Sequence, residues 1–207
     1  MNSLLRAVAL ALLLFVVALV GSACADSKET PAAVPTVATE VFAVINQPSG
    51  VVRIRLATKE APRLSMSFIN LVERGYFNGR PWTDFSPVVR QLGDSIPLFS
   101  VPHEYSPKLM FDVGGRLCAS NTTEDKNGRA KPNRIFITVK EQDRWNLVYC
   151  VFGVVVEGLE VMRNMSEGET VTDIRIEGDS SALRKRFAKE LVDWDAAIDA
   201  ANVGSVR

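Results

Sequence analysis

Three short apolar runs, set close together in the second half of the chain, most constrain how it can fold. They are Arg116–Ser120, Ile135–Val139 and Tyr149–Val156, and loops rich in Asn, Gly and Lys separate them. Short apolar runs bounded by turn-forming residues are typical of antiparallel strands in a barrel or a sandwich. The sequence therefore predicts a mostly β domain built around this part of the chain.

The segment before these runs adds a hairpin and a helix. Val41–Asn46 and Val51–Leu56 flank Gln-Pro-Ser-Gly, which is a hairpin turn signal. Glu60–Gly75 places apolar side chains on one helical face, with Pro62 in its first turn. We expect the next strands to lie within Arg80–Gln91.

Two elements come after the three runs, and a separate helix ends the chain. We expect a second helix over Glu157–Met165 and a last strand over Val171–Ile176. Asp179–Ala201 repeats apolar residues at helical spacing, which predicts an amphipathic helix. Its basic start and acidic end oppose the helix dipole, so packing must stabilise it. This helix either docks on the β domain, which is the favoured interpretation, or binds a partner.

Met1–Ala25 has the pattern of a targeting segment rather than of a folded element. Arg6 supplies a positive start, and the apolar run Ala7–Val20 is too short to span a bilayer comfortably. Two cleavage routes fit the residues after this run: Ala-Cys-Ala suits ordinary signal peptidase, whereas Gly-Ser-Ala-Cys resembles a bacterial lipobox that would lipidate Cys24. Both predict an exported protein. It would be a lipoprotein at the periplasmic face of a bacterial membrane, or a soluble protein that is periplasmic or secreted.

The remaining composition predicts a flexible linker, one domain and no nucleic-acid partner. Asp26–Thr39 is rich in Ala, Thr, Pro and Val with few large apolar residues, as in a linker. The chain thus divides into a signal segment (1–25), a linker (26–39), a domain (40–178) and a C-terminal helix with its tail (179–207). The 24 basic and 24 acidic residues balance, so nothing indicates the basic face that nucleic acid requires.

Cysteine and histidine usage indicates no metal site, because no ligand spacing surrounds these residues. Within the domain, an oxidising compartment would allow a disulfide between Cys118 and Cys150. Both lie in apolar runs, which favours free cysteines that pack as small hydrophobic residues. His103 is the only histidine, and its Pro-flanked loop predicts a solvated side chain. The loop Asn121–Asn133 is also expected to be solvated, since its lysines do not suit a calcium site.

Five short sequence motifs occur one after another along the chain. They are GYFNG at 75–79, QLGD at 91–94, EYSPKL at 104–109, FIT at 136–138 and VFGVVVEG at 151–158. In this order and spacing the chain resembles the cyclophilin-type peptidyl-prolyl isomerases over about residues 41–177. The resemblance implies a cyclophilin-like, eight-stranded closed antiparallel barrel capped by two helices, to which Asp179–Ala201 adds a third.

This resemblance implies catalysis of a bond rotation without covalent chemistry. The X-Pro amide has a barrier of about 20 kcal/mol and, unaided, turns over in tens to hundreds of seconds. In the family an apolar pocket holds the proline ring, and an arginine hydrogen-bonds the proline nitrogen as amide resonance is lost. No triad, metal or cofactor is required. The implied partners are proline-containing segments of exported proteins.

The resemblance also assigns pocket positions to residues of this chain. Phe136 matches the aromatic floor of the proline pocket, Gln91 matches the glutamine that orients the arginine, and Asn121 matches the asparagine whose backbone binds substrate. The other pocket positions depart from the family: Val89 replaces a larger residue, Tyr149 stands where histidine is common, and Trp145 lies beside the position of a tryptophan.

The largest departure concerns the catalytic arginine. Asp84 stands at its position, and Arg134 replaces a glutamine beside the pocket. In one hypothesis Arg134 takes over as donor, oriented by Gln91 and held by Asp84. In the other, Asp84 and Arg134 form a surface ion pair worth about 0–1 kcal/mol, and the groove binds peptides weakly or not at all. The sequence thus predicts a prolyl isomerase of weak activity or, as the alternative, a non-catalytic peptide-binding or assembly module.

Overall fold

The computed structural model describes residues 40–123 and 128–204. The predicted signal segment, the linker and Cys24 lie outside these residues, as do part of the loop after Asn121 and the end of the tail. Within the described ranges, no helix has both the length and the apolar character needed to cross a membrane.

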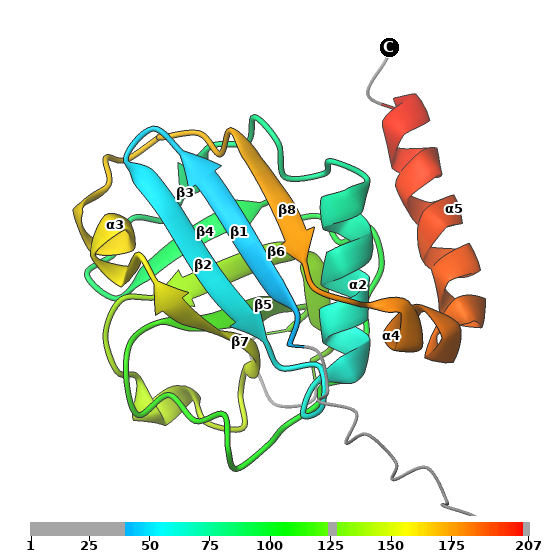
Figure 1. Cartoon of the computed structure of the whole chain (residues 1–207), viewed down its shortest axis with the longest axis horizontal. Coiled ribbons are helices and arrows are strands. Elements are labelled where there is room, and N and C mark those ends of the chain that lie inside the picture. Colours follow the sequence, from blue (N-terminus) through cyan, green and yellow to red (C-terminus); the bar gives the residue numbers. More distant parts are fainter. Residues whose placement is uncertain (1–39, 124–127, 205–207) are drawn as a thin grey trace, which may run out of the picture. The chain divides into compact units, whose positions relative to one another are not determined.

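Eight antiparallel strands form one curled sheet, in the order β3-β4-β6-β5-β7-β2-β1-β8 (Figure 1). The strands are β1 (Phe42–Gln47), β2 (Gly50–Leu56), β3 (Trp82–Thr83), β4 (Val89–Gly93), β5 (Arg116–Asn121), β6 (Ala130–Thr138), β7 (Cys150–Glu157) and β8 (Asp173–Glu177). Alternation decides which side chains turn inward: in β2, Val52, Ile54 and Leu56 are buried in the core. The prediction of a mostly β domain is confirmed.

The sheet is open, so the prediction of a closed barrel is wrong in that respect. Its edge strands, β3 and β8, do not pair with each other. The reason is that β3 has only two residues, and the segment before it bonds to the loop that leads into β8. Gly79 N donates to Val171 O at 2.8 Å, and Val171 N donates to Arg80 O at 2.9 Å. These backbone hydrogen bonds join the two edges outside the strands themselves.

Two helices accompany the sheet, and each is shorter than predicted. α2 (Pro62–Glu73) packs against β6, β7 and β8, and its buried face includes Leu64, Phe68 and Leu71. Pro62 begins the helix, where its missing N–H would have no partner in any case. α3 (Leu159–Asn164) is a short helix that contacts β2. A 3₁₀ turn, η1 (Asp143–Trp145), precedes β7.

The predicted single C-terminal helix is in fact two helices, α4 (Ser181–Arg186) and α5 (Ala188–Gly204). Phe187 separates them because its backbone leaves helical geometry, with φ −107° and ψ 24°. The Phe187 side chain is buried, and this turn therefore directs α5 back along the domain, beside α2 (Figure 1).

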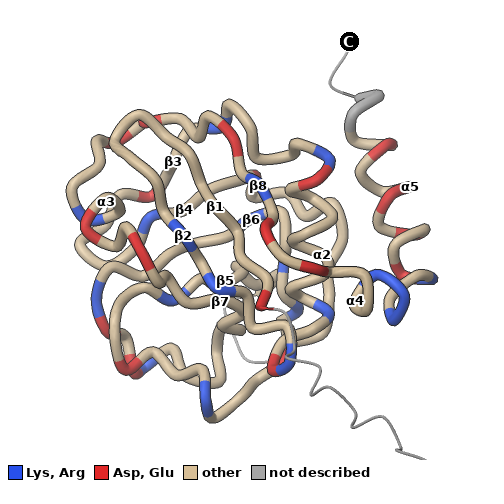
Figure 2. Tube along the Cα trace, in the orientation of Figure 1, with Lys and Arg blue, Asp and Glu red and all other residues tan. Residues whose placement is uncertain are grey.

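The inner face of α5 is buried, as the docked interpretation requires. Leu191, Trp194 and Ile198 are each less than a tenth exposed. The ring of Trp194 stacks on Phe99 with 5.4 Å between centroids and 11° between planes. Packing therefore stabilises this helix despite its unfavourable charge order, in which α4 is basic and acidic residues recur along α5 (Figure 2).

Cys118 and Cys150 are both free and buried. The Cys150 thiol donates to the Glu104 carbonyl oxygen at 2.9 Å. Burial raises the pKa of Cys150 to about 12 and raises the pKa of Cys118 well above its ordinary value. Both thiols are therefore protonated at neutral pH and pack as small hydrophobic residues.

Candidate active site

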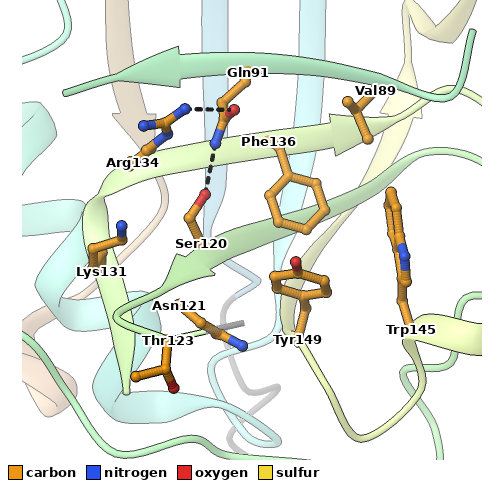
Figure 3. A pocket seen from close by; sticks show the side chains of 10 residues that line it. All are labelled: Val89, Gln91, Ser120, Asn121, Thr123, Lys131, Arg134, Phe136, Trp145 and Tyr149. Atoms are coloured by element: carbon orange, nitrogen blue, oxygen red, sulfur yellow. Dashed lines mark hydrogen bonds between the residues drawn. The ribbon is translucent and has the colours of Figure 1, made fainter. Parts of the chain in front are cut away.

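A cavity of about 290 Å³ opens where β4, β5 and β6 meet η1 and the residues just before β7 (Figure 3). Its lining residues are Val89, Gln91, Ser120, Asn121, Thr123, Lys131, Arg134, Phe136, Trp145 and Tyr149. Most of these stand at the positions that the family resemblance assigned. The fold therefore brings together, in one pocket, residues that come from separate strands and loops of the chain.

One end of this pocket is aromatic. Phe136 is 5% exposed and packs in a cluster with Phe111, Cys118 and Val151. Its ring meets Trp145 edge-on at 5.8 Å and Tyr149 edge-on at 5.2 Å, measured between centroids. Edge-to-face contacts of this kind hold the rings in fixed orientations. The result is an apolar recess whose aromatic walls are held by one another.

The other end is a chain of polar side chains. The Nη2 group of Arg134 donates to Gln91 Oε1 at 3.0 Å and to Asp84 Oδ2 at 3.1 Å. Gln91 Nε2 in turn donates to Ser120 Oγ at 2.7 Å (Figure 3). Phe136 lies directly opposite Gln91 in the β4–β6 ladder, and Arg134 stands two residues before it on β6. Residues two apart on a strand share a face, so arginine and phenylalanine face the same cavity.

Asp84 holds Arg134 from outside the pocket. It does not line the cavity, and its side chain is 60% exposed, whereas that of Arg134 is 23% exposed. The backbone of Asp84 has φ 49°, a left-handed conformation that Asp adopts more readily than most residues. The buried Nε of Arg134 has no hydrogen-bond partner among the described residues.

Gly93 lets β4 approach β6 beside Arg134. It pairs with Arg134 in the ladder and has φ +96°. A Cβ atom here would lie 2.0 Å from the backbone oxygen of Asn133. Only glycine therefore permits the close approach that places Arg134 next to Gln91.

Sequence reasoning misses three lining residues, Ser120, Thr123 and Lys131. Ser120 is the second-last residue of β5, and nothing in its local sequence marks it as the acceptor of a hydrogen bond from the Gln91 amide. Lys131 falls within the loop 121–133 that the sequence predicts to be solvated, but it belongs to β6 and lines the cavity. A register shift between Ala119 and Ser120 places Lys131 opposite Ser120. This shift depends on pairing across strands, which local sequence does not reveal.

His103 is not the solvated side chain that the sequence predicts. It is half-buried, and both ring nitrogens have partners. Nε2 lies 2.8 Å from Asn121 Oδ1, and Nδ1 lies 2.7 Å from the hydroxyl of Tyr105. Since Asn121 Nδ2 donates to the Val148 carbonyl at 2.8 Å, its Oδ1 must accept, and His103 Nε2 carries the donated proton. His103 thus helps to position Asn121 at the pocket.

The described residues contain no group of three or more His, Cys, Asp or Glu side chains arranged to hold a metal ion. What the pocket provides is a rigid apolar recess beside a positioned guanidinium. The recess can bind an apolar ring, and the guanidinium can donate a hydrogen bond to a neutral nitrogen or oxygen near that ring.

Known proteins with similar sequences and structures carry the same fold. The chain is 27% identical over 134 residues to peptidyl-prolyl cis-trans isomerase B of Bacillus subtilis, covering 61% of this chain and 91% of that protein. It is 26% identical over 148 residues to peptidyl-prolyl cis-trans isomerase-like 1 of Mus musculus, covering 65% and 85% respectively. A crystal structure of a Cryptosporidium parvum cyclophilin type peptidyl-prolyl cis-trans isomerase superposes with a TM-score of 0.61 at 18% identity, covering 68% of this chain and 99% of that chain.

The family model described as "Cyclophilin type peptidyl-prolyl cis-trans isomerase/CLD" matches residues 42–181. This span contains all eight strands, helices α2 and α3, and every residue that lines the cavity. The sheet and the pocket thus fall inside the matched region, and α5 falls outside it. The chain therefore belongs to the cyclophilin-type peptidyl-prolyl cis-trans isomerase family, and this membership supports isomerase activity at the level of the family.

Proposed function

We propose that this chain is a prolyl isomerase of low activity that acts on proline-containing segments of exported proteins. One observation carries the proposal: Arg134 is held between Gln91 and Asp84, at the polar side of the Phe136 pocket. The family's arginine is absent at position 84, and another arginine is present at the rim of the same pocket. The chain thus retains both parts that the rotation needs, a recess for the proline ring and a cationic donor.

One nitrogen of the Arg134 guanidinium is left to donate a hydrogen bond to a substrate. Among the described residues, both hydrogen bonds of the Arg134 side chain come from Nη2, so its Nη1 group is not engaged. With the proline ring against Phe136, Nη1 is the group we assign to the proline nitrogen. As the C–N bond twists, that nitrogen becomes pyramidal and accepts a hydrogen bond more strongly, so the donor stabilises the transition state more than the ground state.

Asp84 is the reason to expect a low rate. Asp84 Oδ2 accepts a hydrogen bond from Nη2 of Arg134 at 3.1 Å, and the negative charge of the carboxylate partly offsets the positive charge of the guanidinium. A donor that is partly neutralised stabilises developing electron density less than a free guanidinium does. The same residue favours a second candidate function, a peptide-binding or assembly module that has kept the pocket and lost the chemistry.

A peptide exchange experiment separates the two functions. The protein should raise the cis–trans exchange rate of a short Ala-Pro peptide, followed by NMR, about tenfold or more above the unaided rate. The same peptide titrated into labelled protein should shift the signals of Phe136 and Trp145. A matched peptide with Ala in place of Pro should shift neither. Binding without acceleration would favour the non-catalytic module, and the absence of both would contradict each function.

Export is proposed from the leader sequence, with Cys24 as the lipid attachment site. The mature protein from its native host should then begin at a lipid-modified Cys24, measured by intact mass, and should sediment with membranes. Its only membrane contact would be the lipid. Cys24→Ser should release it into the soluble fraction. A mature mass that begins at Asp26 would instead identify ordinary signal-peptidase cleavage and a soluble exported protein.

A further inference from the structure

Two cations stand together at the polar end of the Phe136 pocket. Lys131 and Arg134 both line the cavity, on the side away from Trp145 (Figure 3). No acidic side chain is among the described residues that line the cavity. Because the whole chain has a formal net charge of zero, this positive end is a local feature of the pocket and not a consequence of a basic protein.

The fold places Lys131 at this end through the register shift in β6. Ala119 pairs with Ile135, whereas the next residue, Ser120, pairs with Lys131. The three residues between Lys131 and Ile135 therefore have no partners on β5, and β6 bulges at this point. The bulge shortens the span along β6 that separates Lys131 from Phe136.

The charge of Lys131 is less compensated than that of Arg134. Arg134 has Asp84 as a partner, at 3.1 Å. Lys131 Nζ donates to the Ser95 carbonyl oxygen at 3.3 Å and forms no ion pair within the described residues. Burial and the nearby charge of Arg134 lower the pKa of Lys131. An anion placed between these two positive charges would reduce their mutual repulsion, and most of all for Lys131, which has no carboxylate partner in the described part of the chain.

We propose that this pocket selects prolyl peptides that carry a side-chain carboxylate within about four residues of the proline. On an extended strand at about 3.3 Å per residue, Arg134 and Lys131 lie roughly 7 Å and 16 Å from Phe136, before the shortening by the bulge. An extended peptide with its proline against Phe136 therefore reaches the cations with its second to fourth neighbouring residue. The inference deepens the proposed function, on which it rests for the placement of proline in the aromatic end.

Peptide titration tests this selection without requiring catalysis. The probes are Ala-rich peptides with one proline and a single Glu placed two, three or four residues before or after it, each matched by a Gln peptide. At low salt, the best Glu peptide should bind the full-length protein about fivefold more tightly than its Gln partner. The ratio should shrink in about 0.5 M salt, because surface charges are then screened. A Lys peptide at the same position should bind more weakly than the Gln peptide.

A pair of charge-matched variants locates the effect. Lys131→Gln should reduce the Glu-to-Gln affinity ratio to below about twofold. Lys189→Gln removes the same charge from an exposed position on α5, away from the cavity, and should keep the full ratio. The ratio is taken within each variant, so a general change in affinity cancels. The salt and Lys-peptide measurements on the unmodified protein remain decisive if Lys131→Gln folds poorly.

The outcomes distinguish this proposal from the proposed function. Equal affinity for all Glu and Gln pairs, or a Lys131→Gln variant that keeps the ratio, would overturn the selection even if exchange were accelerated. A Glu preference without accelerated exchange would support the selection and overturn isomerase activity. A phosphoserine peptide that binds tightly while Glu gains nothing would also overturn the selection, because the ligand would then be a phosphate. Absence of binding by every peptide would overturn both.

Discussion

Replacement of Arg134 by alanine should lower the kcat/KM for X-Pro isomerisation by roughly a hundredfold, as loss of one positioned donor does in other electrostatic sites. Arg134 is the only guanidinium that lines the described cavity, and its Nη2 contacts with Gln91 and Asp84 fix its direction. Removal leaves the aromatic recess in place, because Phe136 packs on Trp145 and Tyr149. Exchange NMR gives the rate and titration gives the affinity, so a loss in rate with little change in affinity identifies a transition-state donor.

Three matched variants sharpen this test. Arg134→Lys keeps the charge but not the planar fork that Gln91 orients, so its rate should lie between those of wild type and Arg134→Ala. Arg175→Ala removes an exposed guanidinium that pairs with Glu177, outside the cavity, and should leave the rate unchanged. The double exchange Asp84→Arg with Arg134→Gln recreates the family pattern and should raise the rate above wild type. An Arg134→Ala variant with the wild-type rate would rule out the donor role.

Substitution of Trp194 by alanine should lower the free energy of unfolding by about 3 kcal/mol, the lower range for a buried tryptophan. Trp194 is 6% exposed, stacks on Phe99 and also contacts Phe187 at 6.4 Å between centroids. Loss of the indole would leave a cavity where α5 meets the domain, at a helix whose charge order gives it little intrinsic stability. Urea unfolding followed by far-UV circular dichroism measures the change.

Val192 supplies the control on the same helix. It is 67% exposed, so Val192→Ala should change the free energy of unfolding by no more than about 0.5 kcal/mol. A similar small value for Trp194→Ala would mean that α5 contributes little to the stability of the domain. Ion pairs of α5 with the domain, such as Arg63–Glu190 at 3.5 Å, are half-exposed and are not expected to compensate.

Much of the pocket can be predicted because its residues lie in short sequence motifs that are typical of the fold. Gln91 and Phe136 belong to such motifs, and the β4–β6 register places them opposite each other. The neighbouring Gly93 must be glycine for this packing. The sequence also predicts the relation between Asp84 and Arg134 as a charge exchange, and the hydrogen bond between them is present in the structure.

Other features of the site depend on contacts between distant residues. The sequence places Lys131 in a loop and His103 in solvent, because each is surrounded by polar or turn-forming residues along the chain. Lys131 enters the pocket through a register shift, and His103 is held by Tyr105 and Asn121. Tyr105 is a near neighbour of His103, but Asn121 and the strand that pairs with Lys131 are farther along the chain, so local sequence does not reveal these contacts.

From the sequence alone, the strands, the helices, the family and the aromatic end of the pocket were determined, because periodic burial and close backbone approaches leave local patterns. The unpaired edges of β3 and β8, the break at Phe187, and the position of Lys131 beside Arg134 in the cavity were decided only by the tertiary structure. These features depend on which backbone groups pair across the sheet and on how much space the packed elements leave. The segments that pair in this way lie far apart in the chain, so the local sequence pattern around each of them does not show which partner it will contact.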